Sequence, residues 1–128
     1  DAAVARARAY AAAGADMIFP EGLSSEDEFA KFAVALREKA PACLLLANMT
    51  EFGKTPLIPA SKFAAMGYQC VIYPVSMLRV AMGAVSKALT QLKAEGNVEG
   101  FLGAMQTRQE LYDLVGYKPG TPWNWPVR

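Results

Sequence analysis

The stretch Leu44-Leu45-Leu46-Ala47-Asn48 decides the fold class of this 128-residue chain. Four consecutive apolar residues followed by an amide are typical of a buried parallel strand that is covered on both faces. Two similar apolar segments flank it in the sequence. Residues 17–20 are followed by Glu21, and residues 70–74 are followed, five positions later, by Arg79. The three runs start 27 and 26 residues apart, the length of one strand, loop, helix and loop. We therefore expect an α/β fold with parallel strands.

Helices are expected between these strands and after the last one. The signals are apolar residues at helical spacing, glycines that end helices, and Ser25 with Glu28 in a capping-box pattern. Ser76 is expected to cap the longest helix, whose apolar stripe is Leu78, Ala81, Val85, Ala88, Leu89 and Leu92. The predicted helical ranges are 1–13, a helix ending near 40 after Ser25, 60–66, 76–93, 98–105 and 108–115.

Composition excludes several classes of function. The chain is 53% hydrophobic and 20% charged with a net charge of +1, which gives no electrostatic footprint for nucleic acid or an anionic membrane. No apolar run approaches the roughly 20 residues that span a bilayer. The start of the chain lacks the apolar stretch of a secretory signal. We expect an intracellular protein, in the cytoplasm or, in a eukaryote, the mitochondrial matrix.

The residues available for chemistry are limited. The chain has no histidine, which removes the commonest general base and zinc ligand. The two cysteines, Cys43 and Cys70, lie in strand-like segments and are expected to be free and reduced. Gly53-Lys54-Thr55 lacks the earlier glycine of a phosphate-binding loop and is a chance match.

Three strand-helix units cannot close a parallel barrel, which needs eight units and about 200–250 residues. We therefore expect an α/β chain that forms the C-terminal part of a parallel (β/α)8 TIM-type barrel, followed by C-terminal helices. The expected division is 1–75 for the last three strand-helix units, 76–117 for a helical region and 118–128 for an irregular tail. Trp123 and Trp125 in this tail are expected to dock on the chain's own core or on another subunit.

Polar residues at the carboxyl ends of the strands are the candidate site, because such barrels keep their chemistry there. Glu21 follows an apolar run and is expected to be partly desolvated, either as a ligand contact or as an ordinary loop residue. Asn48 and Thr50 offer hydrogen bonds to a carboxylate or to neighbouring loop backbone. Arg79 stands in the first turn of a helix, where the dipole disfavours a cation by about 0.3–1 kcal/mol. An anionic ligand would compensate, and the alternative is a surface arginine that reaches back to a glutamate or backbone. Arg108 by itself is a solvated residue at a helix start.

Four segments carry a family resemblance, and they are 14–21, 46–56, 73–79 and 105–112. The most specific parts are Asn48-Met49-Thr50-Glu51-Phe52-Gly53 and Met105-Gln106-Thr107-Arg108. Together they resemble the isocitrate lyase and phosphoenolpyruvate mutase superfamily, and within it the branch that cleaves 2-methylisocitrate. The resemblance covers residues 1 to about 117.

The resemblance implies a Mg²⁺-dependent carbon–carbon lyase that yields pyruvate and succinate in propionate breakdown through the methylcitrate cycle. By position, the implied substrate contacts for this di- or tricarboxylate are Glu21, Asn48, Met49, Thr50, Arg79 and Arg108. The arginines would bind carboxylates, Asn48 and Thr50 would hydrogen-bond the carboxylate end, and Glu21 would hold the hydroxyl side or the opposing arginine. The metal ligands and the catalytic cysteine loop of the family have no counterpart here, so this chain alone is expected to be inactive.

The resemblance also implies a homo-oligomer, a tetramer in which the C-terminal helices are exchanged between neighbouring barrels. Two other interpretations remain open. In the first, the chain is part of another member of the superfamily, either a phosphonate mutase or hydrolase, or an oxaloacetate-type decarboxylase. In the second, it is a non-catalytic half-barrel that acts as an assembly module.

Overall fold

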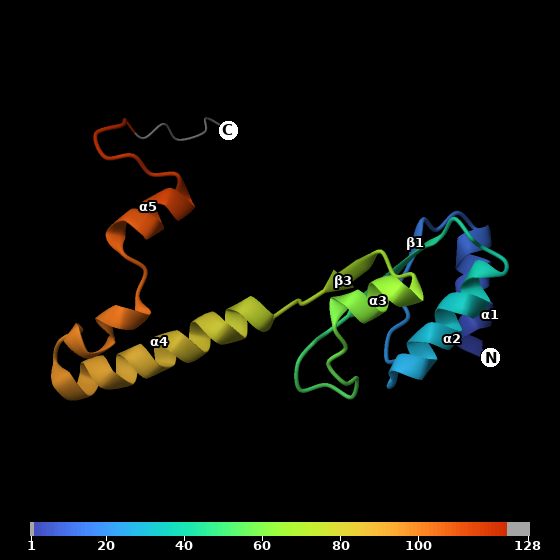
Figure 1. The fold of residues 1–128 in the computed structure, drawn as a ribbon, viewed down its shortest axis with the longest axis horizontal. Helices are drawn as coiled ribbons and strands as arrows, with labels where there is room; N and C mark the ends of the chain where they lie inside the picture. Colours follow the sequence, from blue (N-terminus) through green and yellow to red (C-terminus); the bar gives the residue numbers. More distant parts are fainter. Residues whose placement is uncertain (1, 123–128) are drawn as a thin grey trace. The chain divides into compact units, whose positions relative to one another are not determined.

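The structure is a computed structural model that describes residues 2–122 (Figure 1). The chain forms two compact units, residues 1–82 and 83–128. Three short strands alternate with helices in the first unit, and the second unit is helical. In chain order the elements are α1 (Ala2–Ala12), β1 (Met17–Ile18), α2 (Glu26–Arg37), β2 (Leu44–Asn48), α3 (Ala60–Met66), β3 (Cys70–Ile72), α4 (Ser76–Glu95), the 3₁₀ helix η1 (Glu99–Ala104) and α5 (Arg108–Val115).

The three strands form one parallel sheet in the order β1-β2-β3, which confirms the prediction from the apolar runs. Met17 lies opposite Leu44, and Leu46 lies opposite Cys70. The outer strands are shorter than predicted, because each apolar run ends in a proline that has no N–H for the ladder, Pro20 after β1 and Pro74 after β3.

The sheet is covered on one face. Leu45 and Ala47 of β2 are fully buried, whereas Leu44 is 40% exposed and Leu46 is half-buried. Side chains alternate between the two faces of a strand. The expectation that β2 is covered on both faces is therefore wrong for the part of the chain that the structure describes. Asn48 lies on the same, less covered face as Leu44 and Leu46.

A single hydrophobic core joins the helices of the first unit to the sheet. Helices α1 and α2 contact each other, as do α2 and α3 (Figure 1). Phe29, Phe63 and Tyr68 pack edge to face at the centre, with ring centroids 5.0–5.7 Å apart. Such aromatic pairs contribute about 0.5–1.5 kcal/mol beyond their buried area.

Helix ends follow the sequence signals in most places. Gly67 ends α3 with a φ of +87°, the left-handed conformation that glycine adopts most easily. Ser25 caps α2 by accepting a bond from Glu28 N. The reciprocal half of the predicted capping box is wrong, because Glu28 Oε2 accepts from the backbone N and hydroxyl of Ser24 at 2.6 and 2.9 Å.

The prediction that Ser76 caps α4 is also wrong. Arg79 N donates to Val75 O at 2.9 Å, so Ser76 is the first residue inside the helix rather than the capping residue. Its hydroxyl donates instead to the carboxylate of Glu51.

The second unit contains the rest of α4, then η1 and α5. The expected helix at 98–105 is a 3₁₀ segment over Glu99–Ala104, and the expected helix at 108–115 is confirmed. Thr107 and Glu110 form a complete capping box at the start of α5. Trp123 and Trp125 lie outside the described residues, so their docking stays a prediction, as does the division at 75 and 117. Among the described residues, no helix combines the length and apolarity that a bilayer crossing requires.

Candidate functional site

The carboxyl end of β2 carries the first part of the candidate site. Asn48 is the last residue of the strand and is half-buried. Its Oδ1 accepts a hydrogen bond from Thr50 Oγ1 at 2.7 Å. The structure thus brings these two predicted residues together. The Nδ2 donors of Asn48 have no partner among the described residues, so this amide group can donate to a carboxylate.

Met49 lies between them but its side chain points into the core. It is 1% exposed, and its Sδ accepts a hydrogen bond from Ile58 N at 3.4 Å. Its backbone N donates to Ile72 O at 2.9 Å, which ties the end of β2 to β3. The carbonyl of Met49 is the group that remains for a ligand contact, and this role stays a prediction.

Arg79 meets its anion within the chain. Its Nη1 donates to Glu51 Oε2 at 2.5 Å and to the backbone O of Glu51 at 3.2 Å. The guanidinium carbon lies 5.4 Å from the centre of the Phe52 ring, a cation–π distance. Glu51 therefore compensates for the cation in the first turn of α4. This contact agrees with the second interpretation of Arg79 above, in which the arginine reaches back to a glutamate and to backbone.

Glu51 is a residue that the sequence reasoning missed. Its second oxygen accepts the hydroxyl of Ser76, and this bond is the main cause that lowers the pKa of Glu51, with its own backbone N–H and Arg79 contributing less. The position of Arg79 indicated that such an acid exists, because the helix dipole disfavours a cation in the first turn unless a nearby anion compensates for it. Sequence alone gave no reason to select Glu51, which lies 28 positions earlier.

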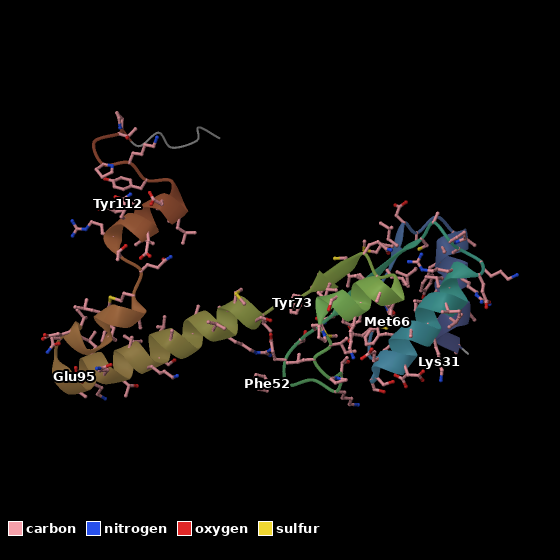
Figure 2. The ribbon with its side chains drawn as sticks, in the orientation of Figure 1. Lys31, Phe52, Met66, Tyr73, Glu95 and Tyr112 are labelled. Atoms are coloured by element: carbon pink, nitrogen blue, oxygen red, sulfur yellow. The ribbon has the colours of Figure 1, made fainter. Side chains whose placement is uncertain are left out.

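Phe52 marks the turn of this loop. Figure 2 labels it on the loop that follows β2. It is 94% exposed, and it is the one non-glycine residue with a positive φ, +64°, in the described part of the chain. A bulky residue in this conformation costs of the order of 1–3 kcal/mol, so the surrounding contacts must hold it there. The ring lies beside Arg79 as a result.

Glu21 and Arg108 are both exposed, and each is described within its own unit. Glu21 lies in an exposed turn after β1, so its expected desolvation is wrong, and within the described residues it has no bond to Arg79. The strand before it is only two residues long, which leaves the turn in solvent. Arg108 is the exposed first residue of α5 in the second unit and has no ion-pair partner within residues 2–122. Both remain predicted contacts.

The described residues do not present a metal centre. No group of three or more His, Cys, Asp or Glu side chains lies together within residues 2–122. Cys43 and Cys70 are free, as predicted, and Cys43 is buried with its Sγ 3.4 Å from Ala15 O. The donors that the site offers to a carboxylate are the guanidinium of Arg79 and the amide group of Asn48.

The family described as phosphoenolpyruvate phosphomutase matches residues 1–93. The chain belongs to this family. The match includes β1, β2, β3 and the cluster of Asn48, Glu51 and Arg79, and it supports the resemblance inferred from the sequence.

Several curated relatives are named 2-methylisocitrate lyase. "Probable 2-methylisocitrate lyase 1" of Corynebacterium glutamicum is 53% identical over 118 residues, which are 92% of this chain and 37% of that protein. "2-methylisocitrate lyase" of Bacillus subtilis is 50% identical over 117 residues, 91% of this chain and 37% of that protein. The chain thus spans little more than a third of the length of these relatives.

Solved structures share the fold. A 2,3-dimethylmalate lyase, described as a member of the PEP mutase/isocitrate lyase superfamily, is 34% identical with a TM-score of 0.72 over 87% of this chain and 37% of its own. An oxaloacetate acetylhydrolase in complex with the product oxalate is 32% identical with a TM-score of 0.77 over 90% and 38%. A phosphonopyruvate hydrolase in complex with oxalate and Mg²⁺ is 26% identical with a TM-score of 0.68 over 88% and 38%.

Proposed function

We propose that this chain supplies the substrate-anchoring part of a carbon–carbon lyase that cleaves 2-methylisocitrate to pyruvate and succinate. The observation that carries the proposal is the 53% and 50% identity, over more than 90% of the chain, to relatives named 2-methylisocitrate lyase. The activity of a whole protein is part of the proposal, because the chain covers 37% of each of these relatives.

The geometry at the end of β2 supports a carboxylate ligand. Thr50 occupies Asn48 Oδ1 and so turns the amide into a pure donor toward a ligand. Arg79 adds a permanent positive charge that is 42% exposed in its side chain. Charged donors bind carboxylates about twice as strongly as neutral ones do. In this proposal Asn48 Nδ2 and the backbone N–H of Thr50 bind one carboxylate end, and the Met49 carbonyl contacts the substrate as a hydrogen-bond acceptor. Arg79 and Arg108 bind carboxylates as cations, and Glu21 holds the hydroxyl side or the opposing arginine.

The reaction explains why cations are needed. Cleavage removes the proton of the substrate hydroxyl, forms the carbonyl of pyruvate, and leaves the electron pair of the broken bond on the carbon that becomes part of succinate. This charge spreads into the adjacent carboxylate before the carbon is protonated. Fixed donors on that carboxylate stabilise the developing charge. In this proposal the residues of the chain bind the substrate carboxylates. None of them serves as the general acid or the general base.

Mg²⁺ is part of the proposed activity, where it would polarise substrate oxygens. The described residues lack a cluster of acidic, cysteine or histidine ligands, and we assign no Mg²⁺ ligand to them. No step attributed here to Asn48, Thr50 or Arg79 depends on the metal.

The proposal extends to assembly and location. We propose a homo-oligomer, a tetramer with exchanged C-terminal helices, in the cytoplasm. Helix α4 supports this assembly, because no residue in it is buried and most of its predicted apolar stripe is exposed. Leu78, Val85 and Leu89 are 45–60% exposed, which is unusual for three large apolar residues on one helix.

A second candidate is another reaction of the same superfamily. The oxaloacetate acetylhydrolase with a TM-score of 0.77 favours it, because that protein was solved with the small dicarboxylate oxalate. Such a ligand needs the same donors as succinate, so the end of β2 by itself does not separate the two substrates. Sequence identity favours the first candidate, at 53% against 32%.

A ligand panel on the purified chain tests the proposal. 2-Methylisocitrate, oxaloacetate and phosphonopyruvate are titrated against ¹⁵N-labelled protein while the signals of Asn48, Thr50 and Arg79 are followed. The proposal predicts saturable shifts at these residues, tightest for 2-methylisocitrate, with no turnover by the chain alone. Tighter binding of either other ligand supports the second candidate. Absence of binding by all three, together with concentration-dependent self-association, supports the assembly module.

A further inference from the structure

Glu51 sits where the loop after β2 meets the start of α4. Both of its carboxylate oxygens are engaged, Oε1 by the Ser76 hydroxyl and Oε2 by Arg79 Nη1 at 2.5 Å. Its backbone O accepts a further bond from the same Nη1 at 3.2 Å. One residue therefore contacts two positions of the first turn of α4 through three acceptor atoms. Its side chain is 23% exposed, less than the 42% of Arg79.

The donors that remain on Arg79 decide what this contact is for. An arginine has five N–H donors in a planar fork. The two on Nη1 are accounted for by Glu51, and among the described residues Nε and Nη2 have no partner. The edge that carries Nε and Nη2 presents two parallel N–H groups, the arrangement that binds a carboxylate bidentately. Glu51 thus leaves the Nε–Nη2 edge of the guanidinium available for a carboxylate.

Phe52 restricts the guanidinium from another direction. Its ring centre is 5.4 Å from Arg79 Cζ, and its positive φ places the ring beside the arginine rather than in the core. The guanidinium is thus held at Nη1 by Glu51 and lies over the ring of Phe52.

We propose that Glu51 is a positioning residue that holds Arg79 so that its free Nε–Nη2 edge faces a carboxylate ligand. This inference rests on the proposed function, since it specifies how the arginine of that site is oriented. Glu51 itself does not touch the ligand. Ser76 supports the arrangement by fixing the second oxygen of Glu51.

The competing interpretation is that Glu51 occupies the place of the ligand carboxylate and must leave before a ligand binds. The geometry favours positioning, because a substitute for the ligand would take the bidentate edge, whereas Glu51 takes one nitrogen. The two interpretations predict opposite effects on affinity when the charge of Glu51 is removed.

The test compares Glu51→Ala, Glu51→Gln and the control Glu26→Ala in the full chain. Glu26 of α2 forms an exposed 2.6 Å ion pair with Lys62 of α3, so its removal also costs one surface ion pair. The first readout, without ligand, is the ¹⁵N relaxation of the Arg79 Nε–H signal, which Arg79→Lys identifies. The second is the Kd for succinate. Circular dichroism confirms that each variant is folded.

Positioning predicts that Glu51→Ala loosens the Arg79 Nε–H and raises the Kd for succinate about fivefold, the scale of one partly exposed ion pair. Glu51→Gln keeps an acceptor for Arg79, so its Kd stays within about twofold of the wild type. Glu26→Ala changes neither readout. Tighter binding in both Glu51 variants, or an unchanged Arg79 signal in Glu51→Ala, overturns the inference.

The two proposals fail in different ways. If the wild-type chain shows no saturable succinate binding, or if Arg79→Lys binds as well as the wild type, the proposed function of Arg79 is contradicted. If the wild type binds and Glu51→Ala binds equally well, the proposed function stands and the role of Glu51 is contradicted. The relaxation measurement without ligand reports on the contact between Glu51 and Arg79 in either case.

Discussion

Residues 2–82 and residues 83–122 differ in how their helices are stabilised. Every buried side chain in the described part of the chain belongs to the first region, and the helices there pack against a sheet. None of the described residues of the second region is buried, although it contains many large apolar side chains. These include Leu89 at 60%, Leu102 at 55% and Leu114 at 71% exposure.

Helices without a core depend on their ends. Helix α5 has only eight residues, too few for a stable isolated helix in water. Thr107 and Glu110 satisfy its first N–H groups, Gly116 ends it with a φ of +67°, and the rings of Tyr112 and Tyr117 pack 4.8 Å apart. The first region thus has a hydrophobic core that stabilises it, whereas the second has local contacts and an exposed apolar surface suited to a partner.

The largest expected loss of stability comes from truncating a core residue of the first region. Phe63 is fully buried, so Phe63→Ala should lower the free energy of unfolding by about 3–5 kcal/mol. The matched change in the second region, Leu114→Ala, should lower it by no more than about 0.5 kcal/mol. Urea unfolding followed by the fluorescence of the aromatic residues measures both. Equal losses for the two variants would show that the regions do not differ as described.

Removing the capping box of α5 tests whether the helices of the second region depend on local contacts. Thr107→Ala removes the cap and should destabilise α5 by about 1 kcal/mol. Amide hydrogen exchange should increase across Arg108–Val115 and stay unchanged in β2, because the cap acts on the first turn of α5 and β2 is held by the core of the first region. Thr121→Ala, in the same region but outside the box, serves as the control. Faster exchange in β2 would contradict the independence of the first region.

The hydroxyl of Tyr68 is a smaller contribution within the core. It donates to Phe29 O at 3.2 Å and is buried. Tyr68→Phe should lower the free energy of unfolding by about 1 kcal/mol at neutral pH, since the carbonyl of Phe29 loses its partner.

Burial raises the pKa of Tyr68, because the phenolate is disfavoured in the core. The folded state therefore holds this proton more tightly than the unfolded state, and stability is lost as the pH rises above the ordinary value of about 10. Urea unfolding from pH 8 to 11 should show this fall in the wild type and less of it in Tyr68→Phe. Parallel curves for the two proteins would contradict the assignment.

The smallest expected effect concerns Glu51. Hydrogen bonding from Ser76, then from its own backbone and Arg79, lowers the pKa of Glu51. A lowered pKa contributes stability above the ordinary value and loses it as the pH falls through the lowered one. Carboxylate ¹³C shifts should therefore titrate below the ordinary range in the wild type and move back toward it in Ser76→Ala. An unchanged titration in Ser76→Ala would show that the serine does not hold the carboxylate.

The sequence was sufficient where short-range chemistry decides the structure. Gly67 predicted the end of α3, and the apolar runs predicted three parallel strands in the right places. Ser25 with Glu28 predicted the start of α2. The carboxylate of Glu28, however, accepts from the backbone N–H and hydroxyl of Ser24 instead of from Ser25, because two adjacent serines offer the same donors. Local patterns do not choose between such equivalent partners.

The site could be predicted only in part for a different reason. Asn48 and Thr50 are close in sequence, and their interaction follows from that proximity. The contact between Glu51 and Arg79 joins residues 28 positions apart, so it depends on how β2, β3 and α4 fold together. Pattern analysis located the unusual charge of Arg79 but not the acid that compensates for it.

Titration of the ¹⁵N-labelled chain with succinate shows whether the end of β2 and the start of α4 bind a carboxylate. We expect saturable shifts at Asn48, Thr50 and the Arg79 Nε–H, which Arg79→Gln abolishes while Glu26→Ala leaves them intact. Shifts that are absent, or that persist at Asn48 and Thr50 in Arg79→Gln with the same Kd, would contradict the account.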